Sequence, residues 1–146
     1  MSTTETRPIL VGVDGSPTSL EALRTAARLG AALDLPVRAV TTWVIDPVLA
    51  GYVPVDTTGP EETARAILDQ SVAAAFDGEP PVDLQADLVY GPAAPTLVEE
   101  SRTASMLVVG SRGLGGFRGM LLGSVSQTCV QHAHCPVLVI RPQARD

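Results

Sequence analysis

The chain contains no lysine, so all ten of its basic residues are arginines. This absence excludes a Walker A phosphate loop, because that loop needs a lysine to reach the β- and γ-phosphates. Arginine suits bidentate contacts with phosphate, but its presence alone does not establish a phosphate site. The net charge is −6 and no basic run is present, which argues against nucleic acid as the main partner.

Aromatic residues make up only 3% of the chain, so the core is expected to consist of alanine, valine and leucine. No stretch approaches the roughly 20 continuous apolar residues of a membrane helix, and no membrane partner is expected. The polar residues 1–6 lack the apolar core of a signal sequence. We therefore expect a cytoplasmic protein with a single domain at residues 7–142 and disordered ends at 1–6 and 143–146.

Cysteine is also scarce, and its two copies, Cys129 and Cys135, lie beside His132 and His134. A zinc site would favour Cys-x2-Cys or His-x3-His spacing, which this group does not match. Cys129 is predicted to lie on a helix and Cys135 to open the last strand. Both are interpreted as small buried apolar residues, and no metal site is predicted.

What the chain does contain is a glycine-rich stretch at residues 106–126. Its apolar start, residues 106–109, predicts a strand that is buried on both faces. A loop with six glycines and two arginines follows, and Gly123-Ser124 can then cap a helix at residues 125–133. Glycines allow backbone N–H groups to approach a phosphate, and a helix N-terminus offers unpaired donors and a favourable dipole. The stretch therefore predicts a site for nucleotide phosphate.

Two other interpretations of these glycines fit less well. A dinucleotide fingerprint, G-x-G-x-x-G, opening at Gly113 and Gly115 would need its third glycine at Arg118. A flexible surface loop is the simpler alternative, but loops of this length in compact domains are usually functional or disordered.

Short apolar runs alternate with helical patterns along the whole chain. Strands are expected at residues 8–13, 37–42, 82–89, 106–109 and 137–140. Helices are expected at residues 17–34, from a capping-box pattern at 58–61 to residue 77, at 93–103 and at 125–133. Ser16 and Pro17 favour the start of the first helix. The irregular segment 43–59 is a candidate cover for the site.

This alternation implies a doubly wound α/β fold, a parallel sheet with helices on both faces. The third strand alternates in its first half, which suits a sheet edge. Such sheets bind ligands at the carboxyl ends of their strands, where the winding direction reverses. With the strand order 3-2-1-4-5, Asp14 after the first strand and Gly110 after the fourth would face each other across one crevice.

The glycine spacing is Gly110-x2-Gly113-x9-Gly123-Ser124, which resembles the nucleotide-binding signature of the universal stress protein family. The segment 11–16 resembles that family's first strand and its Asp-Gly-Ser turn. The resemblance extends over nearly the whole chain, including the last strand. It implies a five-stranded Rossmann-like sheet, of the adenine nucleotide alpha hydrolase-like type and of order 3-2-1-4-5, that binds ATP together with Mg²⁺.

The resemblance also implies which residues hold the nucleotide. Asp14 would accept hydrogen bonds from the ribose, although an aspartate before glycine can also simply form a turn. The backbone at the end of the second strand, with Thr42 favoured, would contact adenine, and Gly110 would lie near the ribose. The implied nucleotide-binding residues are Val13, Asp14, Thr42, Gly110, Arg112, Gly113, Gly123, Ser124, Val125 and Ser126.

Within this set, Gly113, Gly123 and Ser124 would hold phosphates, and the hydroxyl of Ser126 is a further phosphate candidate. Arg112 and Arg118 could pair with the β- and γ-phosphates, or they could be solvated loop arginines.

The resemblance further implies a homodimer formed by antiparallel pairing of the fifth strands, Val137–Ile140. Pairing would cover an apolar edge that is otherwise an aggregation hazard.

Two functions stay open at this point. The first is a module that binds ATP and signals stress to an unknown partner. The second is a slow ATP hydrolase or phosphotransferase, which is disfavoured because the chain has no lysine for the phosphates and no evident carboxylate pair for Mg²⁺. A protein with this fold that binds no nucleotide is a third possibility, which the complete motif disfavours. Turnover of bound ATP with and without Mg²⁺ would distinguish the first two.

Overall fold

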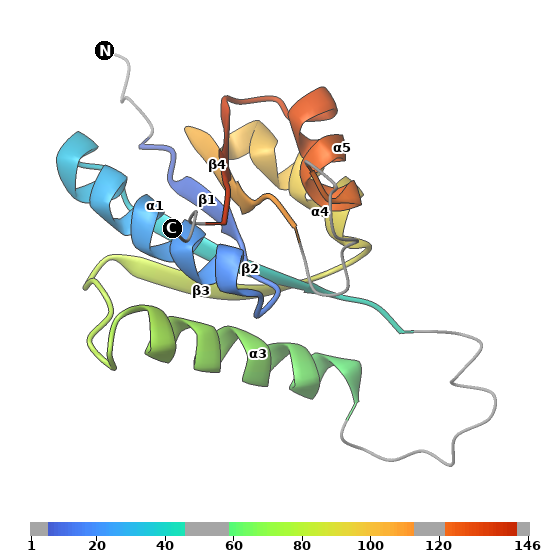
Figure 1. The fold of residues 1–146 in the computed structure, drawn as a ribbon, viewed down its shortest axis with the longest axis horizontal. Coiled ribbons are helices and arrows are strands. Elements are labelled where there is room, and N and C mark those ends of the chain that lie inside the picture. The colour runs from blue at the N-terminus through green and yellow to red at the C-terminus, as the bar shows by residue number, and fades with distance from the viewer. Residues whose placement is uncertain (1–5, 46–58, 113–121, 143–146) are drawn as a thin grey trace.

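The computed structural model describes residues 6–45, 59–112 and 122–142. In these ranges strands and helices alternate along the chain (Figure 1). The elements are β1 (Ile9–Gly12), α1 (Pro17–Leu33), β2 (Val37–Trp43), α3 (Pro60–Ala75), β3 (Leu84–Tyr90), α4 (Ala93–Glu100), the 3₁₀ turn η1 (Ser101–Thr103), β4 (Met106–Gly110), α5 (Ser124–His132) and β5 (Val137–Ile140).

The strands form one parallel sheet in the order β3-β2-β1-β4-β5, which confirms the predicted fold class and strand order. The central strand β1 pairs with two neighbours, so that Ile9 lies opposite Val37 on β2 and Met106 on β4. Ile9, Leu10 and Val11 are almost completely buried, as expected for a strand covered on both faces. The edge strand β5 is only half-buried along its length.

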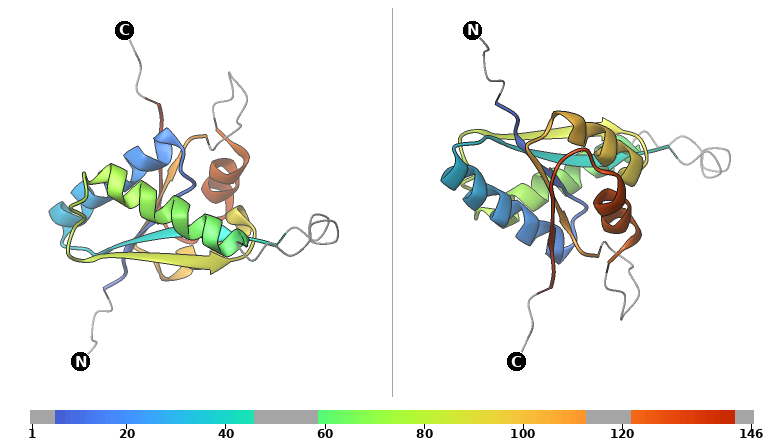
Figure 2. Two further views of the ribbon diagram at one scale, coloured as in Figure 1. Left: turned by 90° about the horizontal axis from the view of Figure 1, so that it is seen from below. Right: turned by 90° about the horizontal axis from the view of Figure 1, so that it is seen from above.

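Helices α1 and α3 cover one face of the sheet, and α4 and α5 cover the other (Figure 2). Each face has its own apolar cluster, and alternate residues of one strand contribute to both. Ile9 and Val11 belong to the cluster beneath α1 and α3, whereas Leu10 belongs to the cluster beneath α4 and α5. This sharing explains why the central strands are continuous apolar runs.

The predicted start and end of the first helix are confirmed. Ser16 is the N-cap of α1, and its hydroxyl oxygen accepts a hydrogen bond from the Ser19 N–H at 3.3 Å. Pro17 occupies the first helical position, where a missing N–H costs nothing. Asp34 ends the helix in the left-handed conformation, with φ 56°.

Several predicted boundaries differ from the structure by one or more residues, and three of them are informative. Helix α3 starts at Pro60 with Gly59 as its N-cap, so the expected capping box does not form; glycine has no side chain to cap with. Strand β3 begins at Leu84 rather than residue 82, because a turn closed by the Leu84 N–H and the Pro81 carbonyl (3.1 Å) precedes it. The helix predicted at 93–103 is α4 followed by the tighter turn η1.

Within the described ranges, no helix is both long enough and apolar enough to cross a lipid bilayer. Several predictions lie outside those ranges and stay untested: the disordered ends apart from Thr6, most of the segment 43–59, and the loop residues Gly113 and Arg118.

Candidate functional site

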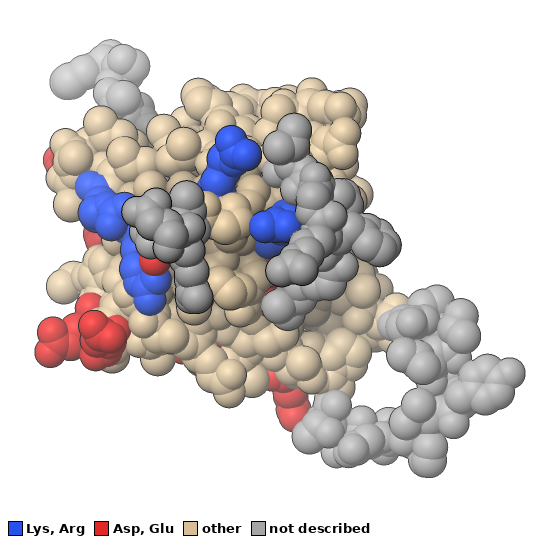
Figure 3. All heavy atoms as spheres, viewed as in Figure 1, with Lys and Arg blue, Asp and Glu red and all other residues tan. Residues whose placement is uncertain are grey.

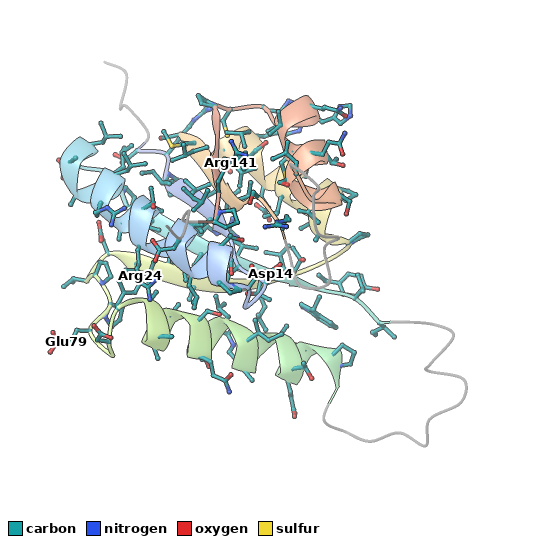
Figure 4. All side chains as sticks on the ribbon, in the orientation of Figure 1. Asp14, Arg24, Glu79 and Arg141 are labelled. Atoms are coloured by element: carbon teal, nitrogen blue, oxygen red, sulfur yellow. The ribbon has the colours of Figure 1, made fainter. Side chains whose placement is uncertain are left out.

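The candidate site lies at the carboxyl edge of the sheet, where the neighbouring strands β1 and β4 end. The chain leaves β1 through Val13 and Asp14, and it leaves β4 through Ser111 and Arg112. Figure 4 shows Asp14 just beyond the end of β1, whereas Arg141 lies farther away beside β5. This is the point where the winding of the sheet reverses, as the sequence predicted.

Asp14 has a structural role that is compatible with ligand binding. Its Oδ1 accepts a hydrogen bond from the Ser16 N–H at 2.9 Å, which closes the turn before α1. The side chain is nevertheless exposed. A carboxylate has two oxygens and about four lone-pair sites, so acceptor capacity is left for a ligand.

Close packing against α1 leaves no room for a side chain at position 110. The sequence did not reveal this constraint. A Cβ atom at this position would lie 2.3 Å from Thr18 Oγ1 and 2.8 Å from Thr18 Cβ. The first turn of α1 therefore approaches the end of β4 more closely than any other residue would permit. Thr18 is buried, and its hydroxyl donates a hydrogen bond to the Arg112 carbonyl at 2.9 Å.

Ser111 joins three elements through its backbone. Its N–H donates to the Ile140 carbonyl of β5 at 2.7 Å, and its carbonyl accepts from the Gly123 N–H at 2.6 Å. The Ser126 hydroxyl also lies 2.9 Å from that carbonyl. The Ser111 hydroxyl is itself buried without a hydrogen-bond partner among the described residues. Sequence reasoning missed both Ser111 and Thr18, because their roles depend on contacts between distant segments.

Ser126, predicted as a phosphate candidate, is almost completely buried. Its hydroxyl lies near the Ser111 carbonyl and 3.1 Å from the Gly123 carbonyl, to either of which it can donate. In this structure the side chain holds the start of α5 against the end of β4.

The start of α5 has unused backbone donors. Gly123 is the N-cap, it provides no side-chain cap, and the Gln127 N–H closes the first helical hydrogen bond to its carbonyl at 2.9 Å. The N–H groups of Ser124, Val125 and Ser126 therefore have no partner within the helix. Such a helix start favours an anion.

The remaining predicted residues lie at or near the carboxyl ends of three neighbouring strands, β2, β1 and β4. Val13 is buried, and its carbonyl accepts from Thr41 Oγ1 at 2.9 Å. Arg112 is half-buried after β4, and Thr42 lies one strand farther out, on β2. Gly113 lies outside the described residues.

The chain as a whole carries −6, but its charged side chains are not evenly spread over the surface. On the side of the molecule drawn in Figure 3, arginine side chains lie over α1 and near the centre, and most acidic side chains lie toward the margin. Local charge of this kind, rather than net charge, determines the field at a binding site.

Neither cysteine forms a disulfide. Cys129 lies on α5 and is completely buried, and burial raises the pKa of its thiol to about 11. Burial also raises the pKa of Cys135. Among the residues described, no three His, Cys, Asp or Glu side chains are grouped so that they could hold a metal ion.

The structure is therefore a doubly wound α/β domain. Its candidate anion site lies at the carboxyl edge of the sheet, between β1 and β4, where the winding direction reverses. The sequence profile described as the universal stress protein family matches residues 5–141. The chain belongs to the universal stress protein family.

Two curated relatives show the same kinship. The chain is 38% identical over 141 residues to a universal stress protein of Mycolicibacterium smegmatis, covering 93% of this chain and 46% of the relative. It is 34% identical over 146 residues to universal stress protein Rv2623 of Mycobacterium tuberculosis, covering 92% of this chain and 48% of the relative. The chain thus spans about half the length of the curated relatives it matches.

Solved structures share the fold. A universal stress protein in complex with cAMP superposes with a TM-score of 0.69 at 26% identity, over 92% of this chain and 96% of the other. The universal stress protein of Archaeoglobus fulgidus in complex with dAMP gives a TM-score of 0.67 at 22% identity, over 92% and 97%.

Replacing Gly110 with alanine should destabilise the protein by roughly 1–3 kcal/mol, because the new methyl group overlaps Thr18. Urea unfolding measures the change. Gly59→Ser is the matched control, since a Cβ atom there meets nothing within 4 Å. Equal stability of the two variants would show that the close approach of α1 to β4 is not a constraint.

Burial of Cys129 predicts an alkaline loss of stability. The pKa of this thiol is higher in the folded chain than in the unfolded chain, so its contribution to the free energy of unfolding is fully present below pH 9. Above pH 9 the thiol of the unfolded chain ionises first, and the free energy of unfolding falls by up to about 2–3 kcal/mol near pH 11. Unfolding of wild type and Cys129→Ala across pH 7 to 11 tests this. The free energy of unfolding of the variant should lack this part of the decline. If it fell with pH in parallel with that of the wild type, Cys129 would not be the cause of the alkaline loss.

Proposed function

We propose that this chain binds ATP with Mg²⁺ between the ends of β1 and β4, and acts as a stress-response module whose partner responds to the bound nucleotide. The observation that carries the proposal is the start of α5. Three backbone N–H groups without helical partners are held at the end of β4, and the exposed carboxylate of Asp14 follows the neighbouring strand β1. Family membership and the cAMP complex of a structural neighbour support a nucleotide as the anion.

Each part of the nucleotide has a proposed contact. The phosphates accept hydrogen bonds from the N–H groups of Ser124 and Val125, and Arg112 supplies positive charge. Asp14 accepts from the ribose hydroxyls, while its Oδ1 keeps the turn closed. Gly113 and Gly123 let the backbone approach the phosphates.

Mg²⁺ would enter with the nucleotide. It is usually bound by phosphate oxygens and water together with one or two carboxylates, so it needs no dedicated cage of side chains.

Binding is favoured over hydrolysis. Fast phosphoryl transfer needs cationic groups on the phosphates and a residue that orients the attacking water. The chain has no lysine, and Asp14 is assigned to the ribose. A cytoplasmic location, expected from the sequence, stays part of the proposal.

Two measurements test ATP binding. Nucleotide released from the purified protein by denaturation is identified by ion-exchange chromatography, and calorimetry with ATP and Mg²⁺ gives the dissociation constant. Gly123→Val should weaken ATP binding at least about tenfold, equivalent to 1.4 kcal/mol, because its side chain blocks the phosphates. Gly59→Val is the control, as its side chain enters open space. Normal binding by a folded Gly123→Val protein would refute the site.

We further propose a homodimer in which two β5 edges pair. The N–H groups of Leu107 on β4 and of Ser111 just after it donate to the carbonyls of Pro136 and Ile140, so the backbone groups of even-numbered positions along β5 face β4. By alternation, positions 137 and 139 direct their backbone groups outward, where a second β5 can pair with them.

Val139→Pro should convert the dimer to a monomer, because proline removes an outward N–H without touching the bonds to β4. Light scattering during size-exclusion chromatography measures the mass. Val139→Ala keeps the backbone donor and should stay dimeric. A monomeric mass for the wild type at micromolar concentration would overturn the proposal.

A further inference from the structure

The first turn of α1 lies between the two strand ends that form the candidate site. Asp14, after β1, accepts a hydrogen bond from the Ser16 N–H, and the Ser16 carbonyl accepts one from the Ser19 hydroxyl at 2.9 Å. These bonds fix the turn in which Thr18 lies, and Thr18 is only 8% exposed. Its hydroxyl is directed to another segment, because it donates to the Arg112 carbonyl at 2.9 Å, 94 positions along the chain. Thr18 therefore links the turn after β1 to the chain that leaves β4.

We propose that Thr18 is a positioning residue for the outer phosphates of the bound nucleotide. By holding the Arg112 carbonyl, its hydroxyl directs the Arg112 guanidinium to the β- and γ-phosphates and gives the site a preference for ATP over AMP. This role rests on the proposed function, and Thr18 fulfils it through another side chain rather than by touching the nucleotide.

The direction of the Arg112 side chain depends on the two peptide groups that flank it. The preceding one is fixed because the Ser111 carbonyl accepts from the Gly123 N–H at 2.6 Å. The following one is held at the Arg112 carbonyl by Thr18. Because peptide groups are planar, holding both of them restricts φ and ψ of Arg112 and thus the direction of its Cα–Cβ bond. Loss of the Thr18 hydroxyl would release the second peptide group.

Packing explains why residue 18 is small, but it does not explain the hydroxyl. A Cβ atom at Gly110 would lie 2.3 Å from Thr18 Oγ1 and 3.0 Å from the Thr18 carbonyl carbon, so α1 is in close contact with the end of β4. Alanine at position 18 would fit the same space. It would not supply a donor for the Arg112 carbonyl, and a carbonyl that packing shields from water is costly to leave without a partner. The hydroxyl is therefore the group to test.

The outer phosphates depend on Arg112 more than the first phosphate does. The start of α5 can hold one phosphate through the N–H groups of Ser124 and Val125. AMP has no further phosphate, whereas ATP has two more, which carry most of its charge. The chain has no lysine, so among its side chains only arginine can supply a permanent balancing charge. Bidentate contact requires an oriented guanidinium, so a displaced Arg112 costs affinity for ATP and little for AMP.

Thr18→Ala and Thr18→Ser differ from each other only in the hydroxyl, and neither side chain is larger than threonine. In calorimetry with Mg²⁺, Thr18→Ala should lose at least about fivefold in affinity for ATP, because the Arg112 carbonyl loses its donor. Thr18→Ser keeps the donor and should retain most of the affinity. The affinity of Thr18→Ala for AMP should fall by less than about twofold. Thr18→Val, which keeps the volume of threonine without its hydroxyl, is a second variant with the same expectation as Thr18→Ala.

A double-mutant cycle with Arg112→Gln separates positioning from a merely structural role. Arg112→Gln keeps the carbonyl that Thr18 holds and removes the charge, so it should itself weaken ATP binding. If Thr18 acts through Arg112, adding Thr18→Ala to Arg112→Gln should weaken ATP binding by less than about twofold. A purely structural role would give the same loss in both backgrounds.

Ser101→Ala is the matched control, because Ser101 is buried and its hydroxyl also donates to a backbone carbonyl, that of Val98. Ser101 lies in η1, which precedes β4, so the variant should bind ATP as the wild type does. Urea unfolding shows that each variant is folded.

Three results would refute the positioning role of Thr18 while ATP binding by the wild type stands. In the first, folded Thr18→Ala binds ATP as the wild type does. In the second, its affinity for AMP falls as much as its affinity for ATP. In the third, its loss of ATP affinity persists in the Arg112→Gln background. If the wild type does not bind ATP, the proposed function fails, and the role of Thr18 fails with it.

Discussion

The candidate site depends on one backbone junction, the hydrogen bonds of Ser111. A single peptide segment at the end of β4 is tied through its N–H to β5 and through its carbonyl to Gly123 at the start of α5. Buried backbone groups of this kind must be paired, so the junction fixes the position of α5 relative to the sheet. Thr18 holds the following residue from the opposite side, through the Arg112 carbonyl. The unused donors of α5 have a defined direction only because of these contacts.

Small residues make this junction possible. Gly110 lets the first turn of α1 reach the end of β4, and the short hydroxyl side chains of Thr18 and Ser126 reach backbone carbonyls. A chain without lysine can still offer an anion site in this way, because recognition relies on oriented N–H groups and the helix dipole rather than on a flexible cation. The net charge of −6 is compatible with such a site, since the dipole acts locally.

Much of the fold was predictable because it depends on local patterns. Continuous apolar runs predicted the buried strands, and Ser16-Pro17 predicted the start of α1 correctly. The errors occurred where a local pattern competed with tertiary packing. The spacing of a capping box is present at 58–61, yet α3 begins one residue later, and the apolar Val82 lies outside β3 and exposed to solvent.

The sequence by itself determined the class of fold, the glycine spacing and the family, because periodicity, turn residues and motif spacing are properties of neighbouring positions along the chain. Only the tertiary structure decided that Thr18 leaves no room for a side chain at position 110, that the Ser126 hydroxyl lies within hydrogen-bond distance of the Ser111 carbonyl, and that Trp43 on β2 packs against Tyr90 on β3. Each of these is a contact between segments that are distant in sequence. Their relative positions depend on how the helices pack on the paired strands, which a pattern of neighbouring residues does not specify.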